Sequence, residues 1–191
     1  MHSTRRPEQY HRSDVTLGEL DPPDREAISR WPSYKTPYEE LDYALRGPGG
    51  WLYTFGAKPD CVKYGAYVEG ELVGFCLLDR SSEDAAKLAR SSPPHCSSEK
   101  AAEFYVAIHP DRLNKGYGKA VTLETLRRGF QELHSHRIFL KVRKNHDIGI
   151  RLYESIGFAK FGECTKTING KDVAFYMMQI TASDCSTRYG Q

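Results

Sequence analysis

Short runs rich in β-branched, aromatic and other apolar residues, bounded by turn residues, predict the strands of this chain. The predicted strands are residues 15–20, 61–68, 72–79, 103–108, 138–142, 161–168 and 171–180. Between the last two lies Asn169-Gly170, the strongest short-range signal for a tight hairpin, and Glu69-Gly70 marks a second hairpin. The pattern therefore predicts two hairpins and three further strands.

Apolar residues spaced three and four apart predict helices between these strands. The predicted helices are residues 25–31 and 37–46, a longer helix from about residue 118, residues 147–156, and a short helix at 83–90 inside the unusually long connection 81–100. The apolar stripes of the two later helices are Leu123, Leu126, Phe130 and Leu133, and then Ile148, Leu152 and Ile156. Gly157 follows the second of these helices and is placed to end it in a left-handed conformation.

The most informative stretch is residues 102–130, which is predicted to form a strand, a glycine loop and a helix. The loop, residues 114–119, reads NKGYGK. Its glycines let backbone N–H groups approach a ligand closely, the helix N-terminus adds a partial positive charge, and the two lysines add full charges. This combination predicts a phosphate site. An ordinary strand-to-helix turn is the alternative interpretation.

Two other phosphate-binding motifs do not fit this loop. The dinucleotide fingerprint needs a third glycine where the chain has Val121, and no segment matches the P-loop. A nucleotide-binding module is therefore disfavoured.

A second strand–loop–helix unit follows at residues 137–158, RIFLKVRKNHDIGIRLYESIGF. The two units in this order, with L-Y-E-x-x-G-F closing the second, resemble the GNAT superfamily of acyl-CoA-dependent N-acetyltransferases. The resemblance covers roughly residues 60–180. It implies an α+β fold with a mixed, mostly antiparallel central sheet flanked by helices. It also implies acetyl-CoA as co-substrate and a primary amine as acceptor, with direct attack in a ternary complex.

The resemblance assigns roles to particular residues. Tyr153 would protonate the departing CoA thiolate, because a phenol with a pKa near ~10 keeps its proton at neutral pH; the alternative is a core tyrosine. Glu103 is the candidate base, directly or through water; the alternative is a charged strand residue at a sheet edge. Tyr105, Lys141 and His146 are weaker candidates for the base. The predicted contacts to the co-substrate are the backbone of Val106, Ala107 and Ile108, the loop residues Arg112, Asn114, Lys115, Gly116, Tyr117, Gly118 and Lys119, and Asn145.

The chain departs from the family pattern at several of these positions. The arginine or glutamine that opens the loop motif falls at Leu113, the asparagine of the second motif at His146, and its alanine at Gly149. In the ribosomal-protein alanine acetyltransferases a glutamate on the second strand acts as base, and that position is Lys141 here. That subgroup's base therefore does not carry over, and a non-catalytic acyl-CoA-binding regulatory domain remains an alternative.

Aromatic residues are concentrated between residues 31 and 55. They are Trp31, Tyr34, Tyr38, Tyr43, Trp51, Tyr53 and Phe55. They are predicted to form a packed subcore; the alternative is a wall of the acceptor groove. In a groove, Glu39, Glu40 and Asp42 would attract a cationic amine, whereas a solvated helix face is the plainer interpretation of these three.

Length and composition limit the remaining possibilities. The 191 residues predict one domain, with flexible tails at 1–13 and 182–191. A net charge of +2 without a basic run argues against nucleic acid, and no apolar stretch approaches the ~20 residues that span a membrane. Five scattered cysteines predict neither a disulfide framework nor a metal site, and fit free thiols in a reducing, cytoplasmic compartment. The hairpin at 161–180 could pair across a homodimer.

Overall fold

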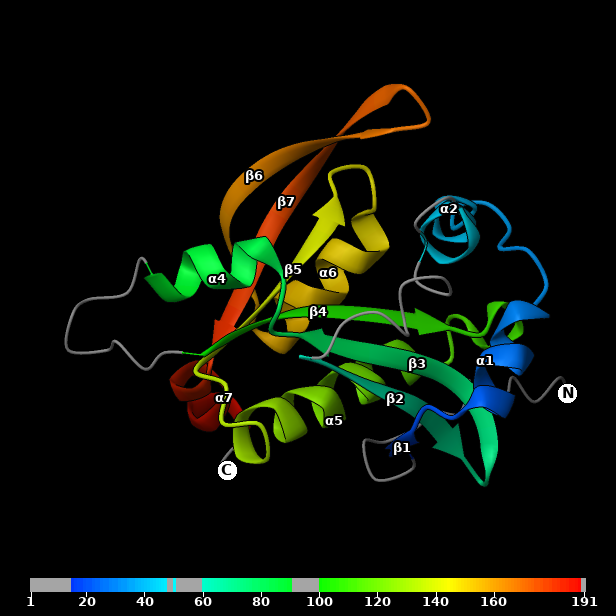
Figure 1. The fold of residues 1–191 in the computed structure, drawn as a ribbon, viewed down its shortest axis with the longest axis horizontal. Helices are drawn as coiled ribbons and strands as arrows, with labels where there is room; N and C mark the ends of the chain where they lie inside the picture. The colour runs from blue at the N-terminus through cyan, green and yellow to red at the C-terminus, as the bar shows by residue number, and fades with distance from the viewer. Residues whose placement is uncertain (1–14, 48–49, 51–59, 91–99, 190–191) are drawn as a thin grey trace, which may run out of the picture. The chain divides into compact units, whose positions relative to one another are not determined.

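The computed structural model describes residues 15–47, 50, 60–90 and 100–189 (Figure 1). Its seven strands are β1 (Thr16–Glu19), β2 (Cys61–Val68), β3 (Glu71–Asp79), β4 (Ala101–Ile108), β5 (Arg137–Arg143), β6 (Ala159–Ile168) and β7 (Lys171–Thr181). They form one sheet in the order β1-β2-β3-β4-β5-β7-β6. The β4–β5 pair is parallel, whereas β1–β2, β5–β7 and β6–β7 are antiparallel. The mixed α+β fold is confirmed.

The helices in the described residues are α1 (Pro22–Ser29), α2 (Glu40–Arg46), α4 (Glu83–Arg90), α5 (Tyr117–Gln131), α6 (Asp147–Ile156) and α7 (Ala182–Tyr189). The chain divides into two compact units. The first contains the residues up to Leu77 together with Val106–Thr125, and the second contains Leu78–Tyr105 and Leu126 onward. None of the helices in the described ranges is long and apolar enough to cross a membrane.

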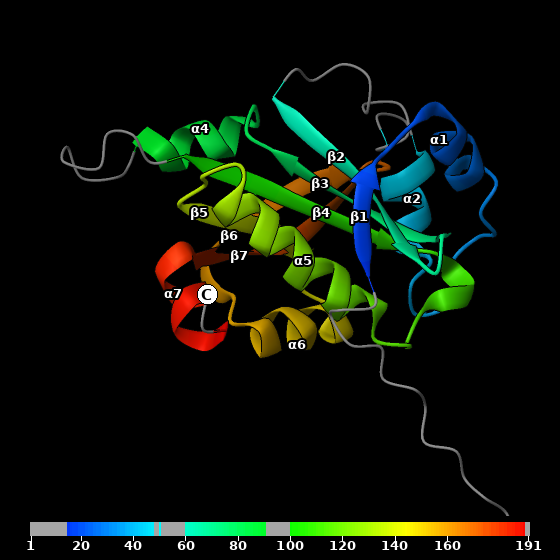
Figure 2. The ribbon, with the colours of Figure 1, turned by 90° about the horizontal axis from the view of Figure 1, so that it is seen from below.

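In the first unit, β1 and β2 pair in antiparallel fashion, and α1 follows β1 directly (Figure 2). Asp21 begins α1 with a capping box, since its side chain accepts the Asp24 N–H at 2.9 Å and the Asp24 carboxylate accepts the Asp21 N–H at 3.3 Å. Prolines in the first turn cost no hydrogen bond there, so they fit the start of α1 at Pro22, and the helix ends at Ser29.

The predicted helix at 37–46 is shorter than expected. Residues before Glu40 form a tight turn instead, in which the Tyr38 N–H bonds the Lys35 carbonyl at 2.7 Å and the Leu41 N–H bonds the Tyr38 carbonyl at 2.9 Å. This turn places Tyr38 before the helix, and its side chain is buried.

In the second unit, β5, β7 and β6 pair along most of their length. The parallel pairing of β4 with β5 covers only Ala101–Glu103 against Arg137–Phe139. Helix α4 lies on one side of these strands and α6 and α7 lie on the other (Figure 2). Ala85 of α4 packs in a cluster with Ala101 and Phe139, so the long connection returns to the sheet and contributes to its core.

Both predicted hairpin turns have the expected backbone. Asn169 and Gly170 have φ values of 52° and 71°, and Glu69 and Gly70 have 51° and 82°. Two successive positive φ values are characteristic of the two-residue turn that matches strand twist.

The predicted buried faces of two helices need correction. In α5 the buried positions include Thr122 and Thr125, whose hydroxyls bond the carbonyls of Gly118 and Val121, each at 2.7 Å. Because these hydroxyls are satisfied within the helix, threonines can occupy a face that sequence pattern gave to leucines. In α6 Ile148 is 43% exposed, and Ile150 is buried instead.

The C-terminal prediction was also wrong, because residues 182–189 form α7 rather than a flexible tail. The start of α7 is fixed by reciprocal bonds between Thr181 and Asp184: the Asp184 carboxylate accepts the Thr181 N–H at 3.1 Å, and the Thr181 hydroxyl accepts the Asp184 N–H at 3.2 Å. The tail at 1–13 and residues 91–99 of the long connection lie outside the described residues.

Candidate functional site

The predicted phosphate loop lies in the first unit, between the end of β4 and the start of α5. A short 3₁₀ turn at Pro110–Arg112 follows the strand, and the His109 ring accepts the Asp111 N–H at 3.1 Å to begin that turn. Asn114 (φ 59°) and Gly116 (φ 88°) then adopt left-handed conformations, and α5 begins at Tyr117. Glycine takes such a conformation without strain, and asparagine tolerates it better than most residues.

Several backbone N–H groups of this loop are open, meaning that they have no hydrogen-bond acceptor in the described residues. The N–H groups of Lys119 and Ala120 both bond the Gly116 carbonyl at 3.1 Å. In contrast, the N–H groups of Lys115, Gly116 and Gly118 have no acceptor anywhere in the described part of the chain. Lys115 and Lys119 are exposed, and the first turn of α5 contains no acidic residue. Open donors with two cations beside a helix N-terminus suit a pyrophosphate.

Arg112, predicted to contact phosphate, is engaged elsewhere. Its guanidinium forms an ion pair with Glu71 at the start of β3, and both side chains are substantially exposed. An exposed ion pair contributes only about 0–1 kcal/mol, so a phosphate could compete for Arg112. Its cofactor role remains a prediction.

The end of β4 is fixed by neighbouring groups of the same unit. The Tyr34 hydroxyl donates to the Ile108 carbonyl at 2.7 Å, and the His109 N–H donates to the Val73 carbonyl at 2.9 Å. A carbonyl has two lone pairs, so Ile108 keeps acceptor capacity. Burial raises the pKa of Tyr34 well above its ordinary value, which keeps this phenol protonated as a donor.

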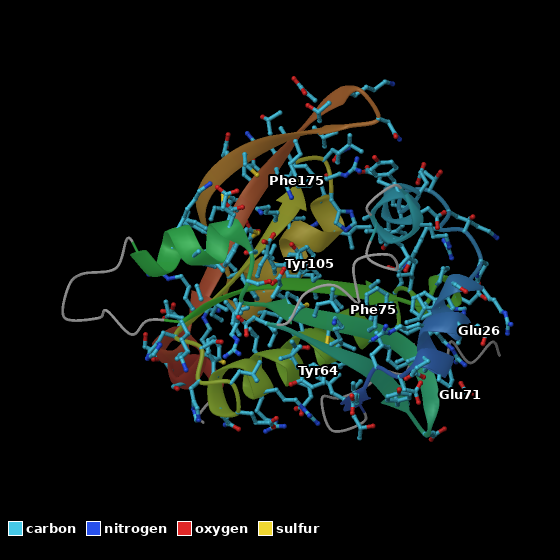
Figure 3. All side chains as sticks on the ribbon, viewed as in Figure 1. Glu26, Tyr64, Glu71, Phe75, Tyr105 and Phe175 are labelled. Atoms are coloured by element: carbon cyan, nitrogen blue, oxygen red, sulfur yellow. The ribbon has the colours of Figure 1, made fainter. Side chains whose placement is uncertain are left out.

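The aromatic segment is a packed subcore where the structure describes it. Trp31, Tyr34 and Tyr38 are all buried. The Trp31 ring lies 6.0 Å from the Phe75 ring and 5.1 Å from the His109 ring, measured between centroids; Figure 3 labels Phe75. Trp51, Tyr53 and Phe55 lie outside the described residues.

Acidic residues of this segment have local partners. The Asp42 carboxylate accepts the Tyr34 N–H at 2.9 Å and pairs with Arg46, and the Glu39 carboxylate accepts the Thr36 hydroxyl at 2.9 Å. These contacts hold α2 to its preceding turn, so attraction of a cationic amine is not needed to explain Asp42 and Glu39.

In the second unit, Glu103 is only 2% exposed and belongs to an interior strand, since β4 lies between β3 and β5 in the sheet. The interpretation as a charged residue at a sheet edge is therefore wrong. The Lys141 ammonium lies 2.9 Å from Oε1 of Glu103 and 2.5 Å from Oδ2 of Asp84 on α4. Lys141 itself is 9% exposed, so a buried cation is shared by two carboxylates.

The two carboxylates bear on whether Lys141, one of the weaker candidates, acts as the base. Burial alone would lower the pKa of Lys141, but the hydrogen bond that Lys141 donates to Asp84 and the nearby Glu103 carboxylate together raise it above its ordinary value of 10.5. The protonated form of Lys141 is therefore favoured, which argues against Lys141 as the base. The same hydrogen bond lowers the pKa of Asp84. Sequence reasoning missed Asp84; its signal was an acidic first turn on the helix predicted within the long connection.

Tyr153 is half-buried on α6, with its ring 5.7 Å from the Phe158 ring in an edge arrangement. Its hydroxyl forms no hydrogen bond with any residue that the structure describes. Burial raises its pKa to about 12. The hydroxyl is therefore protonated at neutral pH and available to an acceptor.

His146 and Gly149, two departures from the family pattern, are close to each other in the structure. A Cβ built at Gly149 would lie 2.3 Å from Cδ2 of His146, so the His146 ring occupies the space that an alanine would need. His146 precedes α6 without capping it through its side chain, and Asn145 is exposed in the turn before it. The cofactor role of Asn145 remains a prediction.

Within the described ranges, no three His, Cys, Asp or Glu side chains gather as a metal site. The described cysteines, Cys61, Cys76, Cys164 and Cys185, are free thiols. Cys96 lies outside the described residues.

Comparison with known proteins gives one family and a consistent fold. The acetyltransferase (GNAT) family matches residues 25–158. A spermidine N(1)-acetyltransferase from Vibrio cholerae is 31% identical over 74 residues, which are 38% of this chain and 43% of that relative. The aligned part is thus less than half of the curated relative's length.

Solved structures of similar fold cover nearly the whole chain. A chimera of the spermidine N-acetyltransferase SpeG from Vibrio cholerae and hSSAT aligns with a TM-score of 0.67 and 20% identity, over 92% of this chain and 99% of the other. A dodecameric structure of spermidine N-acetyltransferase from Vibrio cholerae aligns with a TM-score of 0.64 and 22% identity, over 93% and 99%.

Proposed function

The chain belongs to the acetyltransferase (GNAT) family, the acetyl-CoA-dependent N-acetyltransferases, and on that premise we propose that it acetylates a primary amine by direct attack in a ternary complex. The observation that carries the proposal is the loop before α5. Its open N–H groups at Lys115, Gly116 and Gly118, with two exposed lysines, form a site for the CoA pyrophosphate.

The neighbouring strand end would receive the rest of the co-substrate. We propose that backbone groups of Val106–Ile108 pair with the pantetheine arm as an added strand would. The hydrogen bond from Tyr34 to the Ile108 carbonyl supports this, because it fixes the strand end without using both lone pairs.

For the chemistry, the neutral amine nitrogen attacks the thioester carbonyl, the C–S bond breaks, and the sulfur leaves as a thiolate. Tyr153 is the proposed proton donor to that sulfur. Its unpartnered hydroxyl supports the role, because the phenol is protonated at neutral pH and can donate to the sulfur as the thiolate forms. The thiol leaves as product, and Tyr153 regains its proton from solvent, which takes up the proton lost by the amine.

Glu103 is the proposed base for the amine proton, directly or through a water molecule. Lys141 contacts its Oε1, so Oε2 is the oxygen that we assign to proton transfer. In this arrangement Lys141 is a positioning residue that fixes the carboxylate, and it takes no proton itself.

We propose polyamines as the first acceptor class to test, because the curated relative is named as a spermidine acetyltransferase. The test measures CoA thiol release from acetyl-CoA with spermidine, free lysine, an alanine-terminated peptide or no amine. Amine-dependent release is expected. If the protein binds CoA but no amine raises release, the alternative of a non-catalytic acyl-CoA-binding domain replaces the enzyme.

The same assay tests the proton donor. Tyr153→Phe should lower kcat by roughly 10²–10⁴-fold with little change in CoA affinity. Tyr176→Phe is the matched control, since Tyr176 is another half-buried tyrosine of the second unit. A Tyr153→Phe enzyme within twofold of the wild type would assign the proton to another group.

A further inference from the structure

Three contacts tie the segment before α2 to the strand end and loop that follow β4, all within the first unit. The Tyr34 hydroxyl bonds the Ile108 carbonyl, and the Trp31 ring packs against His109. The third contact reaches the loop itself: the Tyr38 hydroxyl donates to the Asn114 side-chain oxygen at 2.8 Å. These residues are 76 positions apart in sequence, and Tyr38 is 8% exposed, so the bond is anchored in the core.

Asn114 is the residue of this loop that most needs an anchor. It has a φ of 59°, which costs a non-glycine residue of order 1 kcal/mol, and the residue is exposed. The next two residues, Lys115 and Gly116, supply open N–H groups. The backbone dihedrals of Asn114 set the direction of the Lys115 N–H and the course of the chain into Gly116, so whatever holds Asn114 helps to aim both N–H groups.

We propose that Tyr38 is a positioning residue for the pyrophosphate of acetyl-CoA, which it serves by holding Asn114 in the left-handed conformation that aims the loop N–H groups. The inference rests on the proposed function and deepens it. It also assigns a role to the turn that replaces the first residues of the predicted helix at 37–46, because that turn delivers Tyr38 to the loop. The aromatic segment thus contributes to co-substrate binding through its hydroxyl groups as well as to the core.

The proposal makes a distinction between two acyl donors. Acetyl-CoA carries the pyrophosphate, whereas S-acetylpantetheine lacks it and keeps the reacting thioester. Tyr38→Phe removes the hydroxyl that donates to Asn114. The loss of a typical hydrogen bond corresponds to about a three- to tenfold change in an equilibrium constant. KM for acetyl-CoA should rise by that factor with kcat nearly unchanged, and the kinetic constants for S-acetylpantetheine should not change.

Two further variants sharpen the test. Asn114→Gly keeps access to the left-handed backbone but removes the acceptor, so adding Tyr38→Phe to it should cause no additional loss. Tyr43→Phe is the matched control, because Tyr43 lies on the adjacent α2 and its hydroxyl bonds no residue in the described ranges. Its KM for acetyl-CoA should equal that of the wild type.

The outcomes separate the two levels of inference. Wild type that binds no CoA by calorimetry overturns the proposed function, and the role of Tyr38 with it. If the wild type binds CoA and Tyr38→Phe has the same KM for acetyl-CoA as the wild type, only the role of Tyr38 is overturned. An equal loss with both acyl donors also overturns it, because a general structural defect does not distinguish pyrophosphate. Thermal melts of each variant verify that the fold is retained.

Discussion

Replacing Lys141 by methionine should cost far more stability than replacing an exposed lysine. The wild-type ammonium lies 2.9 Å from the Glu103 carboxylate, and the two side chains are 9% and 2% exposed. Lys141→Met keeps the length of the side chain and leaves the Glu103 charge buried without its partner. Breaking one side of a buried pair typically costs about 3–5 kcal/mol, so we expect a loss of about 3 kcal/mol in the free energy of unfolding.

The assay is urea unfolding at 25 °C, with comparison at equal slope. In a thermal scan the same loss lowers Tm by roughly 6–12 °C for a chain of this size. Lys144→Met is the matched control, since Lys144 pairs with Glu163 at 35% and 60% exposure and should lose at most about 1 kcal/mol. Adding Glu103→Gln to Lys141→Met removes the orphaned charge and should restore at least about 1 kcal/mol.

The pH dependence of the loss has a definite sign. The pKa of Lys141 is raised by folding, so its contribution is complete below its ordinary value of 10.5 and disappears as pH rises through the higher folded value. The pKa of Asp84 is lowered, so its contribution is complete above its ordinary value of 3.8 and disappears as pH falls through the lower folded value. The difference between wild type and Lys141→Met should therefore be constant from about pH 5 to 9 and shrink beyond both limits. A Lys141→Met loss no larger than that of Lys144→Met would refute the reasoning.

Two glycines give further predictions. Gly116→Val should weaken CoA binding by at least about tenfold in calorimetry, because a branched residue at φ 88° distorts the loop proposed to meet phosphate. The control is Gly170→Val, at φ 71° in the turn between β6 and β7, which should leave CoA affinity unchanged. Equal effects of the two substitutions would dismiss the phosphate role. Gly149→Ala should destabilise the protein, because its Cβ meets the His146 ring, although alanine in a helix normally gains about 1 kcal/mol over glycine. In a His146→Ala background the same substitution should stabilise the protein. A stabilising effect of Gly149→Ala in the wild type would show that the ring moves aside freely.

Local patterns were sufficient for most elements of the fold. The apolar strand segments, the Asn169-Gly170 and Glu69-Gly70 turns, and the Gly157 cap each depend on a few neighbouring residues, and the structure confirms them. The predictions that failed involved polar side chains whose hydrogen bonds are formed with nearby residues of the same segment. Thr122 and Thr125 bury their hydroxyls against their own helix, and the Thr181–Asp184 capping box begins a helix where composition suggested a tail.

The candidate site was only partly accessible to such reasoning. Gly116 and Gly118 were predicted from the loop motif, because glycines at these positions let the backbone N–H groups approach a ligand. Tyr38 could not be predicted, because its partner Asn114 is 76 residues away and the connection depends on a turn that replaced a predicted helical turn. Asp84 was hidden for a similar reason, since only the return of α4 to the sheet brings it to Lys141.

Lys141 shows how tertiary context changes the meaning of a departure from a motif. In sequence, a lysine at the position of a subgroup's glutamate kept a non-catalytic domain open as an alternative to the enzyme. In the structure, the short parallel register that pairs Glu103 with Phe139 brings the Lys141 ammonium to the Glu103 carboxylate. A lysine without a partner would be costly at 9% exposure, whereas this one is neutralised by Glu103 and Asp84. The substitution is therefore explained by the carboxylates around it, and by itself it no longer favours a non-catalytic domain over an enzyme whose carboxylate stands on β4.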